Sequence, residues 1–307
     1  MANYHSFGYV PDPAGAERFA ASLPHPTFSS AAPDCTASGK DVFLWPALLQ
    51  CSPRWKRGSQ GSVGSCVGWA ASLGVDVTAA CDIAYRHEPE EWRGRTIESS
   101  LYGFSRVEAR GQKVNTGGDG STGWHAAKAI RELGCLHYGV DYGGVVIQEK
   151  GKEARDRDWG RNGVPDKLEP FAKERRCSEV TLVTTFEEAA AAISNGFPVV
   201  VCSGVGFSMT RDDDGFCRPG PTWWHAMLLA AVRWGKRPGL KCFNSWGDSN
   251  TRGKHYPEDL PPAIANCSFW IDADVCTRML SGRDSYAYAG YSGFRVTQIP
   301  DWTGGAL

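Results

Sequence analysis

The chain has 307 residues, of which 42% are hydrophobic, and its 33 Lys and Arg residues nearly balance 34 Asp and Glu residues for a net charge of −1. A chain of this size can bury a sizeable core in one large domain or in two modest lobes. The near-neutral charge provides no basic surface for nucleic acid, and no run approaches the ~18 apolar residues of a membrane span, so we expect neither nucleic acid nor a membrane as a partner.

Residues 1–40 are predicted to form an extended arm rather than a packed unit. Prolines recur along this segment, and proline favours extended and turn conformations. One short helix is expected around residues 14–22. The first residues lack the pattern of a secretory signal, so we expect a soluble protein without a signal peptide.

A glycine-rich turn leads directly into a helix at residues 60–66, which read Gln-Gly-Ser-Val-Gly-Ser-Cys. Apolar residues from Cys66 to His87 recur at steps of three and four, which predicts a helix with one buried face. Cys66 then lies at a helix N-terminus, where unpaired backbone N–H groups and the helix dipole favour the thiolate. A cysteine before a helix is most often a small buried hydrophobe, but the adjacent glycines favour an exposed thiol.

Two further helices are expected at residues 99–109 and 123–133, each followed by a glycine that closes it. The glycine-rich loop between them has no Gly-Lys-Ser/Thr ending and is not a phosphate-binding loop. Residues 143–176 mix charges with Gly and Pro, and the run 149–157 is almost wholly polar. We interpret them as a linker or surface insertion between two lobes.

From Cys177 onward the chain is predicted to be mainly β, with one capped helix at residues 185–194. The acidic segment 212–215 lacks the first and last ligands of a calcium loop and is predicted to be a solvated hairpin turn. The expected strands are 180–183, 197–202, 224–233, 240–243, 268–271 and 293–296.

The eleven cysteines include no C-x-x-C pair, so zinc ribbons and thioredoxin-type redox motifs are disfavoured. Cys81 and Cys202 lie in apolar segments, where free structural thiols are expected, although an oxidising environment could pair some of the other cysteines. We expect no metal site and no organic cofactor.

Cysteine, histidine and asparagine follow one another in an order that nucleophilic catalysis uses. His225 opens an apolar run, and Asn244 begins Asn-Ser-Trp-Gly after a predicted strand. A nucleophilic thiol needs a base and a group that orients the base, which Cys66, His225 and Asn244 can supply. Taken singly, His225 fits a core histidine and Asn244 a turn residue. The joint pattern favours a catalytic site.

The motifs Gln-Gly-x-x-Gly-Ser-Cys, His-Ala and Asn-Ser-Trp-Gly, in this order across most of the chain, resemble the papain-like cysteine peptidase family. The resemblance implies an α+β fold with two lobes, one helical and one an antiparallel β-barrel-like sheet, with the active-site cleft between them. Residues 41–176 would form the helical lobe and 177–307 the β lobe. Residues 1–40 would be a short pro-segment or a latch, and whether they gate the cleft is open.

The resemblance also implies roles for individual residues. Cys66 would be the nucleophile, His225 the acid and base, and Asn244 the residue that orients the histidine. Gln60, six positions before the cysteine, would donate a hydrogen bond to the oxyanion. The residues expected to contact an extended peptide substrate are Gly117, Gly118, Gly120, Trp224 and Trp246.

The chain departs from the family at two positions. Val63 stands where papain-type enzymes usually carry a disulfide-bonded cysteine, and Val67 stands where a tryptophan usually follows the nucleophile. The missing disulfide fits a reducing compartment, so a cytoplasmic or virion-associated location is expected. Both departures favour a divergent bacterial or phage-type member of the family.

The sequence therefore predicts a cysteine peptidase, or a closely related amide hydrolase, that acts on a peptide or protein substrate. Two alternatives stay open. The first is a structural component of a virion or other assembly that binds a protein partner and cleaves once or not at all. The second is a transpeptidase or amidase that uses the same four residues.

Overall fold

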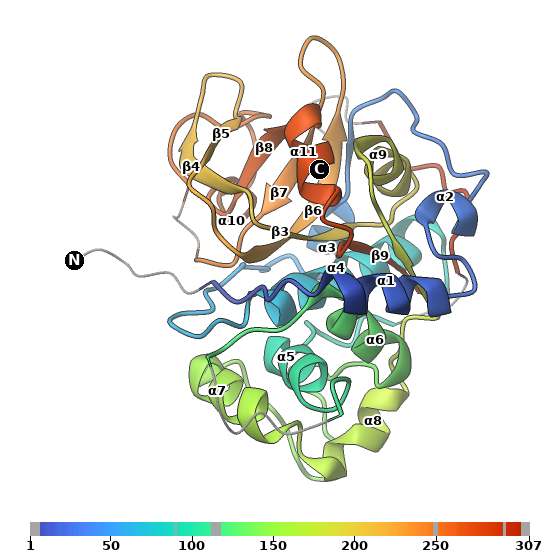
Figure 1. Ribbon diagram of the computed structural model, residues 1–307, viewed down its shortest axis with the longest axis vertical. Coiled ribbons are helices and arrows are strands. Elements are labelled where there is room, and N and C mark those ends of the chain that lie inside the picture. The colour runs from blue at the N-terminus through green and yellow to red at the C-terminus, as the bar shows by residue number, and fades with distance from the viewer. Residues whose placement is uncertain (1–6, 90, 112–117, 248–250, 291–292, 302–307) are drawn as a thin grey trace.

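The computed structural model describes residues 7–89, 91–111, 118–247, 251–290 and 293–301. A helical lobe and a lobe built on a β-sheet lie one above the other in Figure 1, and helix α4 (Cys66–Tyr85) runs between them. α4 packs against helices of one lobe and strands of the other. It is buried on nearly every side, which explains a sequence that is apolar all round.

The helical lobe contains the helices that lie between α4 and β2 in the sequence. They are α5 (Glu98–Arg106), α6 (Gly123–Glu132), α7 (Lys152–Asn162), the 3₁₀ turn η1 (Asp166–Leu168) and α8 (Glu169–Lys173). α5 packs against α4, α6 and α7. The Thr122 side chain caps α6 by accepting the backbone N–H of His125.

α4 is the one described helix that is long and apolar enough to cross a membrane. In the structure, 89% of the apolar 18-residue stretch of α4 is buried inside the protein. Its hydropathy therefore reflects its position in the core between the lobes.

The second lobe contains an antiparallel sheet with the strand order β2-β9-β3-β6-β7-β8, and β1 also pairs with β6. The strands are β1 (Val42–Phe43), β2 (Glu179–Leu182), β3 (Val199–Ser203), β6 (His225–Arg233), β7 (Gly239–Phe243), β8 (Ser268–Asp272) and β9 (Tyr286–Ala289). The expected antiparallel sheet is confirmed, but among the described strands β2 and β8 do not pair, so it is no closed barrel.

Three helices pack against strands of this sheet, α9 (Phe186–Ser194), α10 (Pro262–Ala265) and α11 (Ala273–Leu280), and α3 (Trp45–Cys51) packs against α4. α4 and α9 both pack against β6, so that strand is buried from His225 to Val232 and reads as a continuous apolar run. A separate hairpin joins β4 (Gly206–Arg211) to β5 (Cys217–Gly220) through the acidic turn, as predicted.

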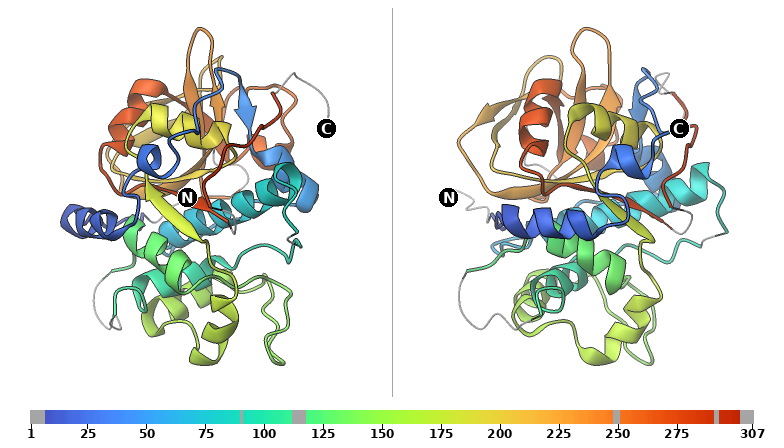
Figure 2. Two further views of the ribbon diagram at one scale, coloured as in Figure 1. Left: turned by 90° about the vertical axis from the view of Figure 1, so that its right-hand side faces the viewer. Right: turned by 45° about the vertical axis from the view of Figure 1, so that its right-hand side comes forward.

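The N-terminal segment packs against both lobes. It contains α1 (Pro13–Ser22), close to the expected helix, and α2 (Phe28–Ala31). In Figures 1 and 2 the segment before α1 runs between the lobes, and α1 lies beside α6. Phe19 and Phe28 are buried, so the segment is held by apolar contacts with the rest of the protein.

Two expectations about elements were wrong. Residues 293–296 form no strand; Phe294 instead packs edge-on against Phe28 and Phe197, which buries the ring without a ladder of backbone hydrogen bonds. Residues 143–176, expected as a linker or surface insertion, contain α7, η1 and α8. α7 buries Asp156, Trp159 and Gly160, while the other residues of the polar run that lie in this helix stay partly or fully exposed.

Close packing of α4 on α5 gives a testable expectation. A Cβ at Gly68 would lie 2.6 Å from Cβ of Tyr102 and 2.7 Å from its backbone nitrogen. Gly68→Ala should lower the free energy of unfolding by roughly 1–3 kcal/mol, although alanine gains ~1 kcal/mol in helix propensity. Urea unfolding measures the change.

Gly74→Ala in the same helix is the matched control. Its Cβ would meet only side-chain atoms of Val200 and Tyr288, at 3.1 Å or more, and these can shift. A Gly68→Ala protein as stable as the Gly74→Ala protein would contradict backbone contact between α4 and α5.

Candidate active site

Cys66 is the first residue of α4, so the helix begins at the proposed nucleophile as predicted. Its side chain is fully buried, and the backbone N–H groups of Ala226, Gly8 and Val67 act on the sulfur in the direction that lowers the pKa of the thiol. Ala226 follows His225 in β6. Packing of α4 on β6 therefore brings the cysteine beside the strand that carries the histidine.

His225 and Asn244 come together because β6 pairs with β7. His225 begins β6, Asn244 directly follows β7, and Nε2 of the imidazole lies 2.8 Å from Oδ1 of the asparagine. An amide oxygen only accepts, so Nε2 carries the proton of the ring. The indole of Trp246 packs against the imidazole with ring centroids 4.6 Å apart, as expected for a residue that shields this pair.

Gln60 is tied to the loop that follows Asn244. Its Oε1 accepts a hydrogen bond from Ser245 Oγ at 2.6 Å, and its backbone N–H donates to Ser245 O at 3.0 Å. Its Nε2 donates to Val63 O at 2.8 Å. The amide is thus held between the asparagine loop and the turn that leads to Cys66. The structure brings all four predicted catalytic residues to one place.

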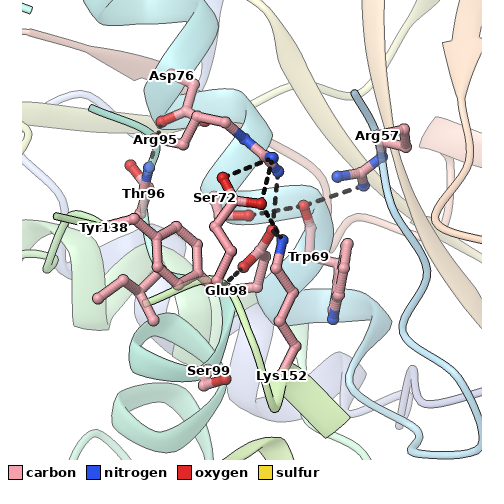
Figure 3. Close-up of polar contacts among 12 residues, drawn as sticks. Arg57, Trp69, Ser72, Asp76, Arg95, Thr96, Glu98, Ser99, Tyr138 and Lys152 are labelled. Carbon is pink, nitrogen blue, oxygen red and sulfur yellow. Dashed lines mark hydrogen bonds and ion pairs between the residues drawn. The ribbon is translucent and has the colours of Figure 1, made fainter. Parts of the chain in front are cut away.

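Arg57 joins the loop at Asn244 to α4. Its Nε donates to Asn244 O at 2.8 Å, and its Nη2 donates to Trp69 O at 3.1 Å, the contact drawn in Figure 3. Burial lowers the pKa of Arg57 to about 10, so the side chain remains charged at neutral pH. No motif in the sequence pointed to this residue.

A buried ionic network fixes the start of α7 against α5. Glu98 accepts from the Tyr138 hydroxyl at 2.6 Å and pairs with Arg95 at 3.1 Å and Lys152 at 3.3 Å (Figure 3). Burial alone would raise the pKa of Glu98, but Lys152 and Arg95 hold it below its usual range. The carboxylate therefore stays ionised and anchors both helices.

Asp156, on α7, supports the turn before Cys66 and was missed from the sequence. Its Oδ2 accepts from Ser65 Oγ at 2.6 Å and from Trp69 Nε1 at 3.0 Å, while Ser99 Oγ donates to Oδ1. Burial raises the pKa of Asp156 to about 6. The buried residues Asp156, Trp159 and Gly160 follow one another at steps of three and one, so they lie on one face of the helix. This spacing is the signal in the sequence that could have predicted α7 within its polar run.

The N-terminal segment passes over this site. Tyr9 N donates to Trp224 O at 3.1 Å, Ser121 N donates to Gly8 O at 2.9 Å, and Val10 N donates to Ser121 O at 2.8 Å. Tyr9 and Ser121 form a parallel bridge. The segment is therefore bound as a short strand between the glycine-rich loop of one lobe and the residue before His225 in the other.

Gly8 makes the closest approach to the nucleophile turn. A Cβ at this position would overlap the carbonyl oxygen of Gly64, so only glycine fits the observed path. Next to it, the ring of Phe7 lies 5.7 Å from those of Trp223 and Trp246 and 6.0 Å from the imidazole of His225. Residues 7 and 8 thus cover Cys66 and His225.

The position of residues 7 and 8 over the thiol corrects one expectation about Cys66. The adjacent glycines favoured an exposed thiolate, but the thiol is buried, and burial raises its pKa to about 12 although backbone N–H groups act in the opposite direction. The thiol is therefore protonated in this arrangement. Gly61 and Gly64 serve the turn and the passage of Gly8 rather than exposure.

The residues expected to contact substrate are placed as follows. Gly117 lies outside the described residues. Gly118 and Gly120 lie in the loop before Ser121, where their carbonyl oxygens accept from Arg106 at 2.6 and 2.5 Å. Trp224 contacts Tyr9 through its backbone oxygen and its half-exposed ring, and Trp246 contacts His225 and Phe7. Ser121, in the same glycine-rich loop, makes the backbone contacts with Gly8 and Val10.

A scan against protein-family models finds no match, and a search of curated proteins also finds none. Solved structures do match. Xylellain, a cysteine protease from Xylella fastidiosa, is 16% identical over 95% of this chain and 94% of its own, with a TM-score of 0.52. Digestive procathepsin L 3 from Tenebrio molitor larval midgut is 14% identical over 90% and 79%, with a TM-score of 0.49.

The likeness to xylellain extends over almost the whole of both chains. It shows that this chain has the papain-like fold, so the resemblance predicted from the motifs is confirmed at the level of the fold.

The position of Gly8 predicts how the thiol reacts. Gly8→Ala should lift residues 7 and 8 away from Gly64 and expose Cys66 without touching the core of either lobe. We expect Cys66 to be alkylated by iodoacetamide at least about tenfold faster at pH 7 than in the native chain, because a less buried thiol regains a pKa near its unperturbed value of ~8.5.

Peptide mapping of the labelled cysteines measures this rate. Val10→Ala is the control, because its side chain is 46% exposed and its backbone bond to Ser121 is unaffected. Equal labelling of Cys66 in the native, Gly8→Ala and Val10→Ala proteins would mean that the segment does not protect the thiol.

Proposed function

We propose that this protein is a cysteine peptidase in which Cys66 attacks a peptide carbonyl. The observation that carries the proposal is the hydrogen bond of 2.8 Å between His225 and Asn244, covered by Trp246 and adjacent to the helix N-terminus that bears Cys66. A nucleophile, a base and a group that orients the base are the components of covalent catalysis by a thiol.

The proposed reaction begins with transfer of the Cys66 proton to His225. Because Nε2 of the imidazole is engaged with Asn244, the nitrogen that receives the thiol proton is Nδ1. The thiolate attacks the carbonyl carbon, and the oxyanion is bound by Gln60 and the backbone N–H of Cys66. His225 then protonates the leaving amine, and water hydrolyses the acyl-enzyme with His225 as the base.

A substrate would bind where the N-terminal segment now lies. Gly8, Tyr9 and Val10 already use Trp224 O and both backbone groups of Ser121, which are the bonds an extended peptide needs. The loop that contains Gly118 and Gly120 forms one wall, and Trp224 and Trp246 flank the reactive pair. Since the cleft accepts a segment of polypeptide, the proposed substrate is a peptide or a protein.

Residues 1–40 would act as an attached latch. In the closed arrangement Gly8 covers the sulfur, and burial keeps the thiol protonated. The segment crosses the cleft in an extended conformation, and Tyr9 forms a parallel bridge with Ser121. Backbone hydrogen bonds and the ring of Phe7 hold it there. Turnover therefore requires that residues 7–10 leave the cleft while α1 stays packed.

The test of the peptidase proposal uses the Gly8→Ala chain, in which the cleft should be open. Adding Cys66→Ala or His225→Ala should reduce turnover of a mixed peptide library by at least about four orders of magnitude, because either change removes the covalent step. Thermal unfolding should change little, since these side chains line the cleft.

Cys81→Ala is the matched control, because Cys81 is a buried cysteine of the same helix far along the chain from the cleft. It should keep turnover while losing some stability. Retained turnover in the Cys66→Ala or His225→Ala protein would exclude the proposed mechanism.

Gln60 should affect turnover more than substrate binding. The oxyanion exists only along the reaction path, so Gln60→Ala in the open chain should lower kcat by about 10²–10³-fold with a small change in KM. Steady-state kinetics on one fluorogenic peptide separate the two constants. Unchanged kcat with a much higher KM would mean that Gln60 binds the ground state instead.

A further inference from the structure

A cavity of about 660 Å³ lies between the two lobes, beside the second half of α4. Its wall includes Cys135 from the helical lobe and Cys177 and Gly290 from the β lobe. Asp82, also on the wall, lies about 24 Å along α4 from Cys66 at 1.5 Å per residue. The cavity is therefore separate from the cleft that residues 7–10 cover, and its volume suits a small molecule.

The floor of this cavity is acidic. Asp76 and Asp82 both line it and are both buried. Asp76 Oδ1 accepts the backbone N–H of Thr96 at 2.8 Å (Figure 3), and burial raises the pKa of Asp76 to about 7, against the effect of Arg95. Burial also lowers the pKa of His137 on the wall to about 4, so this imidazole is neutral at pH 7.

The rim differs from the floor because it carries charges of both signs. The charged rim residues, exposed or half-exposed, are Glu88, Glu91, Arg93, Glu174, Arg175 and Arg176. None of the buried lining residues that the structure describes is a cation. The charge that can select an occupant therefore lies at the floor.

One oxygen of Asp82 is left without a donor. Oδ1 accepts from Arg86 Nη1 at 2.5 Å, but Oδ2 is buried and has no hydrogen-bond partner among the described residues. Arg86 directs its other nitrogens elsewhere, since Nη2 donates to Asn195 O at 2.6 Å and Nε to Thr297 Oγ1 at 2.9 Å. A buried carboxylate oxygen in this state is costly, so a donor from the cavity would stabilise it.

Gly290 gives this oxygen its place at the cavity wall. A Cβ at position 290 would lie 1.9 Å from Asp82 Oδ2, so only glycine fits beside it. Thr78, which also lines the cavity, donates its hydroxyl to Gly74 O at 2.9 Å and keeps the capacity to accept. The floor therefore offers oxygen acceptors to a group that brings its own donors.

We propose that this cavity binds a small aliphatic amine, such as a diamine, whose ammonium group donates to Asp82 Oδ2. An ammonium group is compact and positively charged, with three donors and no acceptor. The half-buried indole of Trp92 on the wall can pack against the methylene groups. A metal ion fits less well, because among the described residues no three His, Cys, Asp or Glu side chains gather as ligands.

This proposal does not rest on the peptidase function and is tested on the native chain by calorimetry with cadaverine, 1,5-diaminopentane, at pH 8 and low salt. We expect saturable binding of one molecule per chain and a rise in Tm, because the occupant contacts both lobes. 1-Pentanol has the same carbon chain without charge and should bind at least about tenfold more weakly, the range of a hydrogen bond to a charged group.

Two variants that each remove one negative charge locate the site. Asp82→Asn should weaken cadaverine binding at least about tenfold, because it removes the charge of the unpartnered oxygen. Glu91→Gln is the charge-matched control at the exposed rim and should change the affinity by no more than about twofold.

Ala79→Phe tests the cavity without changing any charge. Ala79 lines the cavity and is half-buried, so a phenyl ring there should fill the space and reduce binding at least as much as Asp82→Asn. If Asp82→Asn does not fold, Ala79→Phe decides.

Several results would overturn the proposal. Absence of saturable cadaverine binding to the native chain would mean that water alone serves Asp82 Oδ2. Equal affinity for 1-pentanol would remove the role of charge. Binding that survives Ala79→Phe, or that falls equally in Glu91→Gln and Asp82→Asn, would mean general attraction to the protein surface.

Discussion

The structure depends on the packing of α4 against β6. Cys66 is the first residue of the helix and His225 is the first residue of the strand. The contact between this helix and this strand is part of the interface between the two lobes. A small shift between them would separate the thiol from the imidazole, and misplacement of ~1 Å can cost about 10²-fold in rate.

Buried charged side chains hold this geometry from behind. Arg57 binds the backbone of Asn244 and of Trp69, and Asp156 binds Ser65 directly before the nucleophile. Taking a charge out of water is costly, so such a group persists where its hydrogen bonds are made in one arrangement. Removal of Arg57 would take this donor from the carbonyl oxygens of Asn244 and Trp69, and removal of Asp156 would take this acceptor from Ser65.

Two opposing effects act on the thiol of Cys66. The helix N-terminus and the surrounding N–H groups favour the thiolate, whereas burial disfavours it, and burial wins while residues 7 and 8 cover the sulfur. The covering segment uses the backbone bonds that a substrate would use.

The sequence by itself determined the features that depend on near neighbours. These are the helix that begins at Cys66, the capped helix after Thr185, the acidic hairpin turn, and the order of cysteine, histidine and asparagine, because capping, periodicity and turn chemistry act over a few residues. The α+β class followed from the same motifs. Only the tertiary structure decided the open sheet, the role of Asp156 and the burial of Cys66. Each of these joins segments that lie far apart in the chain, and their contacts, not local propensity, set exposure and pKa.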